Sequence, residues 1–182
     1  SEVYIGQEVD LILRIRELLD ELAPDVMLKV RPYPFRHRNL LFMYDRLRAR
    51  RGIEILEYGE LMGPTRVPTA GDFTDKFHQM AAACGIVNLG STIGLEAAFT
   101  NTPILQIAFV PGRPGAPAST DIADLLLNEH LRHLLDHDLP NVLHSEADLR
   151  RALRDITGGA LDPYREYTRR LRDFVGADTT EP

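Results

Sequence analysis

The stretch Ile86-Val-Asn-Leu-Gly-Ser-Thr-Ile-Gly-Leu-Glu-Ala-Ala-Phe-Thr-Asn-Thr-Pro-Ile-Leu-Gln-Ile107 decides the fold of this chain. It opens with Ile86 to Leu89, an apolar run with the length and type of a buried strand. Gly90-Ser91-Thr92 is a small-residue turn, Leu95 to Phe99 has a helical pattern, and Ile104 to Ile107 is a second apolar run. The stretch therefore predicts a strand–turn–helix–strand unit. Open α/β sheets bind ligands at such a turn, outside the carboxyl ends of their strands.

The turn carries the groups that an anion site needs. The first N–H groups of a helix have no partner within the helix and carry the positive end of its dipole. Gly90 lets the backbone approach a ligand closely because no Cβ intervenes, and Ser91 and Thr92 add hydroxyl donors. Together these groups suit a phosphate or pyrophosphate. The alternative is that Ser91 only caps the helix.

Glu96 stands four residues after Thr92 and therefore shares one helix face with it. It lies about one turn, roughly 5 Å, deeper than the phosphate position. At that depth a carboxylate can accept hydrogen bonds from a ribose diol without strongly repelling the phosphate. The alternative is an acid that faces solvent near the positive end of a helix.

The composition is that of an ordinary globular protein. The chain has 182 residues, of which 44% are hydrophobic and 26% charged, and its formal net charge is −6. This charge disfavours a general nucleic-acid or anionic-membrane surface, so an anionic ligand needs local donors. Cys84 is the one cysteine, which excludes an internal disulfide, and we expect it to be a small buried core residue. With no membrane span or signal peptide in view, we expect a cytoplasmic protein, which is compatible with peripheral membrane association of the intact protein.

Strand and helix patterns alternate along the chain. Short strands are expected near residues 26, 53, 86, 104 and 141, with helical patterns between them. The alternation predicts an α/β fold, a Rossmann-like doubly wound parallel sheet of about five strands with helices on both faces. Such a fold normally opens with a strand, whereas the first helical pattern here begins near residue 8. We therefore expect the first strand, and a whole preceding domain, to lie outside this chain.

Local signals set the expected ends of the elements. Val9 to Leu22 has an apolar stripe at helical spacing. Gly52 is expected to end a helix over Leu40 to Arg50, and Ser145 to cap a helix over Leu149 to Ile156. Glu57 to Asp72 is expected to be a long functional or mobile loop.

Two further groups of side chains are candidates for function. Arg31 follows a strand and opens a cationic loop that continues through Arg36, His37 and Arg38. A guanidinium matches phosphate with two parallel donors, which makes Arg31 the best candidate to clamp a diphosphate, and a solvated loop is the alternative. His130, His133 and His137 share a helical face, but solvent-facing histidines are commoner there than metal ligands, so no metal is expected.

The run from Ala81 to Ile107 resembles the nucleotide-sugar motif of GT-B-fold glycosyltransferases, in the version found in enzymes that build bacterial surface polysaccharides and capsules. That pattern is a helix, a short strand, a Ser/Thr turn, a helix with Glu, and a strand that opens with a small residue and Pro. Leu28 to Pro34 resembles the strand that often ends in a basic-Pro-His-Pro sequence, with Tyr33 in place of the His. A paired-Glu variant of the motif has a second Glu eight residues after the first, where Ile104 stands here. The resemblance covers roughly residues 8 to 160, and only its central unit is specific.

The resemblance implies the roles of the site residues and the partners. Ser91 and Thr92 match positions that contact phosphate, and Glu96 matches the position that contacts ribose. Residues 1–160 correspond to a Rossmann-like donor-nucleotide-binding domain, and residues 161–182 to a basic helix with a polar tail. The nucleotide-sugar is then a substrate, and neither a cofactor nor a metal is required. An amino-terminal acceptor-binding domain, missing from this chain, supplies the general base, so no catalytic residue is assigned.

Two other functions remain open at this point. A nucleotide-sugar epimerase of the same fold needs carboxylates in the cleft beyond Glu96. A non-catalytic scaffold module needs Ser91 only as a cap. For the basic helix, whose arginines are Arg165, Arg169, Arg170 and Arg172, the alternative to a role against the other half is a solvated basic face.

Overall fold

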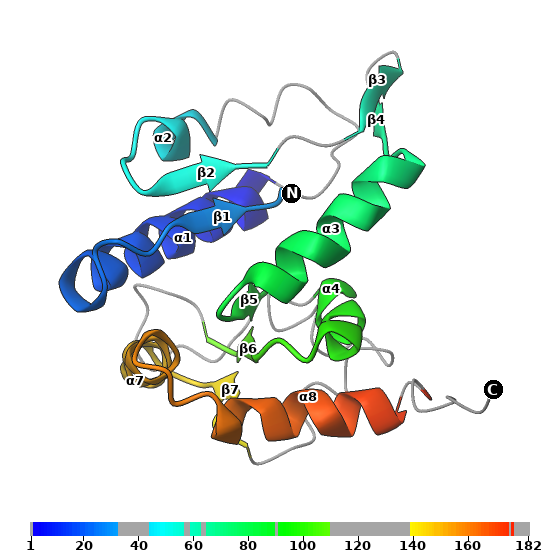
Figure 1. The fold of residues 1–182 in the computed structure, drawn as a ribbon. Helices are drawn as coiled ribbons and strands as arrows, with labels where there is room; N and C mark the ends of the chain where they lie inside the picture. Colours follow the sequence, from blue (N-terminus) through cyan, green and yellow to red (C-terminus); the bar gives the residue numbers. More distant parts are fainter. Residues whose placement is uncertain are drawn as a thin grey trace. The chain divides into compact units, whose positions relative to one another are not determined.

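The computed structural model describes residues 2–32, 44–56, 59–62, 65–89, 91–109, 139–174 and 176. The chain has an α/β fold and divides into two compact units, Ser1–Lys76 and Phe77–Pro182 (Figure 1). Each unit contains a small parallel sheet, and unit 1 also contains an antiparallel hairpin. Among the described residues, none of the helices combines the length and the apolarity that a membrane span needs.

Unit 1 is built on a long amphipathic helix, α1 (Glu2–Leu22). The predicted apolar stripe is confirmed, because five of its members have at most 6% of their surface exposed: Leu11, Ile12, Ile15, Leu18 and Leu19. Strands β1 (Leu28–Val30) and β2 (Ile53–Ile55) pair in parallel, with Val30 opposite Ile55. A core cluster joins α1 to β1 and to the short helix α2 (Asp45–Arg48).

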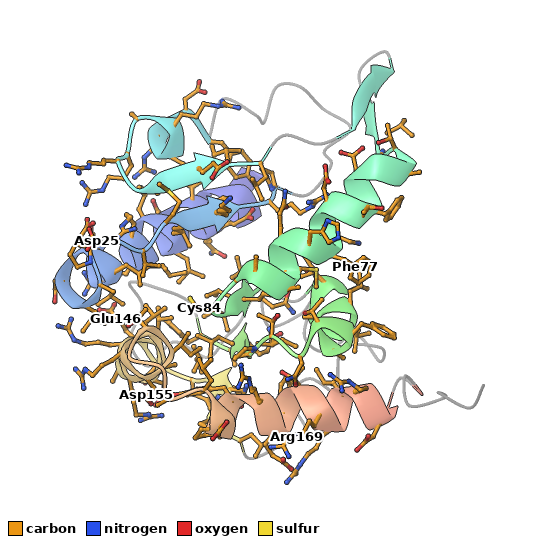
Figure 2. All side chains as sticks on the ribbon, viewed as in Figure 1. Asp25, Phe77, Cys84, Glu146, Asp155 and Arg169 are labelled. Atoms are coloured by element: carbon orange, nitrogen blue, oxygen red, sulfur yellow. The ribbon has the colours of Figure 1, made fainter. Side chains whose placement is uncertain are left out.

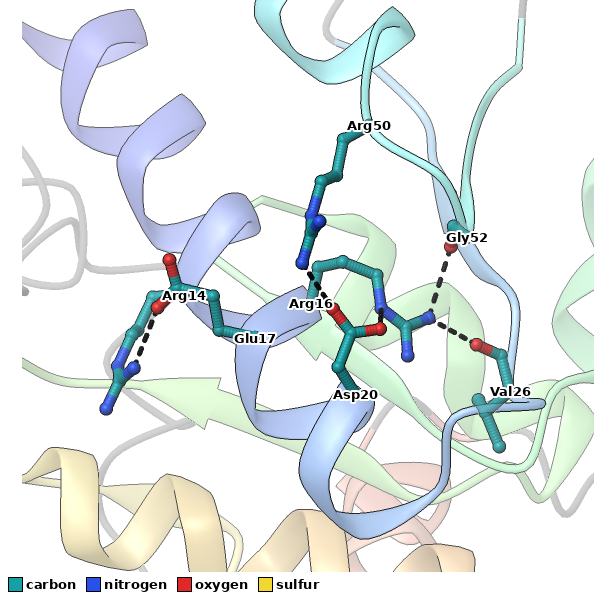
Figure 3. A network of polar contacts seen from close by, with 7 residues as sticks. All are labelled: Arg14, Arg16, Glu17, Asp20, Val26, Arg50 and Gly52. Carbon is teal, nitrogen blue, oxygen red and sulfur yellow. Dashed lines mark hydrogen bonds and ion pairs between the residues drawn. The ribbon is translucent and has the colours of Figure 1, made fainter.

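Arg16 of α1 is a buried charged residue that contacts the chain just before both strands of unit 1 (Figure 3). Arg16 has no exposed surface, and its guanidinium donates to the carbonyls of Val26 and Gly52, the second at 3.2 Å. Its Nε atom lies 3.0 Å from the carboxylate of Asp20, which also pairs with Arg50. Gly52 has a φ of +80°, and an added Cβ would lie 2.9 Å from Arg16 Nη1, so this turn requires glycine.

The long segment before α3 (Ala70–Ala82) contains a hairpin rather than an unstructured loop. Strands β3 (Glu60–Met62) and β4 (Thr65–Val67) pair antiparallel. Asp72 fastens this hairpin to the start of α3, because its carboxylate accepts from the backbone N–H groups of Gly59 at 2.9 Å and Thr69 at 2.7 Å. Thr69 Oγ1 in turn accepts from the Asp72 N–H at 3.3 Å, so Thr69 caps the start of α3.

Unit 2 contains a three-stranded parallel sheet in the order β5 (Ile86–Asn88), β6 (Ile104–Ile107), β7 (Val142–Leu143). The central strand β6 is buried along its whole length. Between β5 and β6 the chain forms one turn of α-helix, α4 (Ile93–Glu96), followed by the 3₁₀ helix η2 (Ala97–Thr100). Two longer helices, α7 (Glu146–Thr157) and α8 (Asp162–Phe174), pack against β7 and against β6 with η2, respectively.

Helix α8 belongs to the core of unit 2. Tyr164, Tyr167 and Leu171 are buried, and Thr168 Oγ1 donates to the Thr102 carbonyl at 3.1 Å. Three of its arginines lie on the outer face, where Arg165 pairs with Asp162 while Arg169 and Arg170 pair with Glu166. The fourth, Arg172, instead donates from Nε to the Ala98 carbonyl of η2 at 3.0 Å. Arg169 is seen on this outer face in Figure 2. The first unit ends at Lys76 and the second begins at Phe77, and the division near residue 160 stays a prediction.

The predicted strands and one predicted cap are confirmed. Strands lie close to all five expected positions, and Ser145 caps α7 by accepting from the Asp148 N–H at 3.2 Å. The strands are shared between two small sheets, β1 with β2 and β5 with β6 and β7. The helix expected over Leu40 to Arg50 is described only from residue 44 onward, as α2.

Candidate functional site

The candidate site is the turn that follows β5 in unit 2. Strands β5 and β6 run parallel with Asn88 opposite Gln106, so the turn leaves the sheet at its carboxyl edge. Ser91 and Thr92 lead from this edge into α4, with Thr92 at the cap position. The predicted strand–turn–helix–strand unit is confirmed in this form. Gly90 lies outside the described residues.

Ser91 forms hydrogen bonds with the side chain of Asn88, a residue that was not among the candidates from sequence. Asn88 Oδ1 accepts from the Ser91 N–H at 3.2 Å and from the Ser91 hydroxyl at 2.9 Å. Asn88 Nδ2 donates to the Ser91 carbonyl at 3.1 Å. Both Ser91 donors that the sequence assigned to a phosphate therefore have an acceptor within the protein.

Gln106 extends this network into the sheet. Its Oε1 accepts from Asn88 Nδ2 at 2.8 Å, and its Nε2 donates to the Asn88 carbonyl at 3.2 Å. Asn88 is 1% exposed and Gln106 has no exposed surface. One signal in the sequence marks this pair: each is the polar residue in an otherwise apolar strand, and buried amides in such strands need partners.

Thr92 is the exposed residue of the turn. Its side chain makes no capping hydrogen bond, while its carbonyl accepts from the N–H groups of Leu95 at 3.0 Å and Glu96 at 3.2 Å. Because α4 is a single turn, its dipole is much weaker than that of a long helix. We therefore expect the Thr92 hydroxyl to contribute more to binding an anion than the dipole of α4 does.

Glu96 closes α4 and is half-buried, with its Oε2 atom shielded from solvent. The chain continues directly into η2, whose Ala97 and Ala98 belong to the core. Asn101 ends η2 with a φ of 55°, the left-handed conformation that asparagine tolerates. The carboxylate therefore lies at the margin of the apolar interior rather than fully in solvent, and its contact with a ribose stays a prediction.

Arg31 belongs to unit 1. Its guanidinium donates to the Asp72 carbonyl at 3.4 Å, and its charge contributes to lowering the pKa of Asp72. Hydrogen bonds from Thr69 and Gly59 are the larger causes, and they hold that pKa at about 2. The assignment of Arg31 to a diphosphate stays a prediction.

Several other candidates lie outside the described residues: Arg36, His37, Arg38, His130, His133 and His137. Within the described ranges, no three His, Cys, Asp or Glu side chains gather in a way that could hold a metal ion. The expectation of a buried Cys84 is wrong, because this free thiol is exposed just after α3 (Figure 2). The small residues around it predicted a core position, but β5 begins only after Gly85, and the turn between them is at the surface.

Comparison of the chain with protein-family models, with curated protein sequences and with solved structures gave no match.

Proposed function

We propose that this chain is the donor-binding half of a glycosyltransferase, which takes a sugar from a nucleotide-sugar and passes it to a surface-polysaccharide or related acceptor. The observation that carries the proposal is the β5–turn–α4–β6 unit. It brings the Ser/Thr turn to the carboxyl edge of a parallel pair and sets Glu96 at the end of the following helical turn. This is the order of elements in the nucleotide-sugar motif that residues 81–107 resemble.

The proposal includes a finer description of the fold. The five parallel strands β1, β2, β5, β6 and β7 would belong to a Rossmann-like, doubly wound arrangement, with an acceptor-binding domain preceding this chain. In such an enzyme the bond between the sugar and the diphosphate breaks, and the acceptor hydroxyl forms the new bond after losing its proton to a base of the other domain. Donors near the turn stabilise the charge that develops on the departing diphosphate.

A specific observation favours a second candidate, a non-catalytic module. Both donors of Ser91 are already paired with Asn88, as in a turn that serves only its own structure. If the hydrogen bonds between Asn88 and Ser91 serve only to stabilise the turn, the turn binds no ligand. The two candidates therefore make opposite predictions for nucleotide binding.

Calorimetric titration of the full chain with UDP, GDP, CDP and ADP tests the proposal. We expect one of these nucleotides to bind, and Thr92→Val to weaken its binding about 10- to 100-fold, because that change removes one hydroxyl donor to a charged group and keeps the shape of the side chain. Glu96→Ala is expected to weaken it as well. Ser145→Ala is the matched control, since Ser145 caps α7 and has no part in the site. Failure of all four nucleotides to bind supports the non-catalytic module.

A further inference from the structure

The hydrogen-bond partners of the buried pair Asn88 and Gln106 fix the orientation of both side-chain amides. Gln106 Nε2 lies 3.2 Å from the Asn88 carbonyl and 3.3 Å from the Ile107 carbonyl. Carbonyl oxygens only accept, so this end of the Gln106 amide must be the NH₂ group. The opposite end is then the oxygen, and it accepts from Asn88 Nδ2 at 2.8 Å.

The same reasoning fixes Asn88. Its Nδ2 faces the Ser91 carbonyl, an acceptor, at 3.1 Å, and its Oδ1 faces the Ser91 backbone N–H, a donor, at 3.2 Å. Two backbone groups of Ser91 and two backbone carbonyls of the strands thus agree on the orientation of both amides. Reversing either amide would set donor against donor or acceptor against acceptor in a site with almost no exposed surface.

The consequence falls on the hydroxyl of Ser91. Asn88 Oδ1 can only accept, so the contact of 2.9 Å between it and Ser91 Oγ uses the single hydroxyl proton of Ser91. What remains on Ser91 Oγ is lone-pair density. Toward a ligand this serine is therefore an acceptor, which suits a hydroxyl group and opposes a phosphate oxygen.

We propose that Ser91 accepts a hydrogen bond from a ribose hydroxyl of the nucleotide, and that Asn88 and Gln106 are the positioning residues that give it this polarity. The inference rests on the proposed function and reassigns one residue within it. Thr92 is then left as the hydroxyl donor of the turn toward the diphosphate.

The test compares a nucleotide with its form that lacks the ribose hydroxyls. The wild-type chain and Ser91→Ala are titrated with the nucleoside diphosphate that binds among UDP, GDP, CDP and ADP, and with its 2′,3′-dideoxy analogue. We expect Ser91→Ala to weaken the ribonucleotide about fivefold, the effect of one neutral hydrogen bond, and to leave the affinity for the dideoxy analogue within about twofold. Asn88→Ala is expected to reduce the preference for the ribonucleotide in the same way, because the Ser91 hydroxyl then turns freely.

Each other outcome has a separate meaning. Equal weakening of both ligands by Ser91→Ala contradicts the acceptor role, since it indicates a contact to the phosphates or a general disturbance of the turn. No weakening of either also contradicts it. If the wild-type chain binds none of the four nucleotides, the proposed function itself fails, and the ribose contact fails with it.

Discussion

At the scale of the residue, Arg16 carries its charge inside unit 1, with no exposed surface. It donates to the carbonyls that precede β1 and β2 and pairs with Asp20, so it joins α1 to the amino ends of both strands (Figure 3). Arg16 stands among the apolar residues of Val9 to Leu22, and nothing in their spacing gives a reason to bury a charge there. The carbonyls of Val26 and Gly52, which are distant from Arg16 in sequence, give its buried guanidinium acceptors.

Arg16→Met is expected to lower the free energy of unfolding by about 2–3 kcal/mol, because two part-buried carbonyls lose a charged donor. Arg46→Met is the control, since the ion pair of Arg46 with Asp10 is more than 60% exposed on both sides and should contribute at most about 0.5 kcal/mol. Urea denaturation of the three chains measures both values. Equal losses for the two variants would show that Arg16 contributes no more than a surface arginine.

Glu8 gives unit 1 a dependence on pH. Burial raises the pKa of this carboxyl, and the hydrogen bond from the Tyr44 hydroxyl, at 2.8 Å, lowers it by less. A raised pKa means that the folded chain holds the proton more tightly than the unfolded chain. The contribution of Glu8 is therefore most favourable below its ordinary value of 4.5 and is lost as the pH rises through the folded pKa.

Glu8→Gln is expected to stabilise the chain at pH 7 relative to the wild type and to flatten the fall of stability with rising pH. The amide stays uncharged and still accepts from Tyr44. Denaturant unfolding at intervals between pH 4 and pH 8 gives the comparison. Parallel pH profiles for the two chains would mean that another group carries the dependence.

At the scale of the element, the β3–β4 hairpin depends on Asp72. The hydrogen bonds from Thr69 and Gly59 hold the pKa of Asp72 at about 2 because its charged form accepts them more strongly than its protonated form. Because the folded pKa is lowered, this tether is fully present above the ordinary value of 3.8 and is lost as the pH falls through about 2.

Asp72→Asn is expected to speed hydrogen exchange at the backbone N–H groups of Gly59 and Thr69, because an amide is a weaker acceptor than a carboxylate. Asp75→Asn, an exposed change in the same helix, should leave these rates unchanged. Exchange followed by NMR at pH 6 reads both positions directly. Faster exchange in both variants would trace the effect to α3 as a whole rather than to the tether.

Prediction of the elements from sequence succeeded where the signal was local. The stripe of α1, the five strands and the Ser145 cap follow from residue spacing and from side chains that act within a few residues. The hairpin was missed because its anchor, Asp72, joins positions 13 residues apart in sequence. In the candidate site, the turn and Glu96 could be chosen from their residue types alone. The hydrogen bond between Asn88 and Gln106 could not, because it joins residues 18 apart in sequence and forms only when β5 pairs with β6.

At the scale of the whole molecule, two α/β units have separate cores, one on α1 and one around β6 and α8. Each contains a small parallel sheet. The tyrosines of α8 show that this helix packs in unit 2. Tyr164 and Tyr167 are buried in unit 2, and Asn141 Nδ2 donates to the Tyr164 carbonyl at 2.8 Å.

Hydrogen exchange with and without a bound nucleoside diphosphate is the most direct test of the central claim, that the turn after β5 is a nucleotide site. The full chain is exchanged alone and with saturating amounts of UDP, GDP, CDP and ADP in turn. We predict that one nucleotide slows exchange in residues 88–96 and that Thr92→Val reduces this protection. Unchanged exchange in residues 88–96 with all four nucleotides, or protection confined to another part of the chain, would contradict the claim.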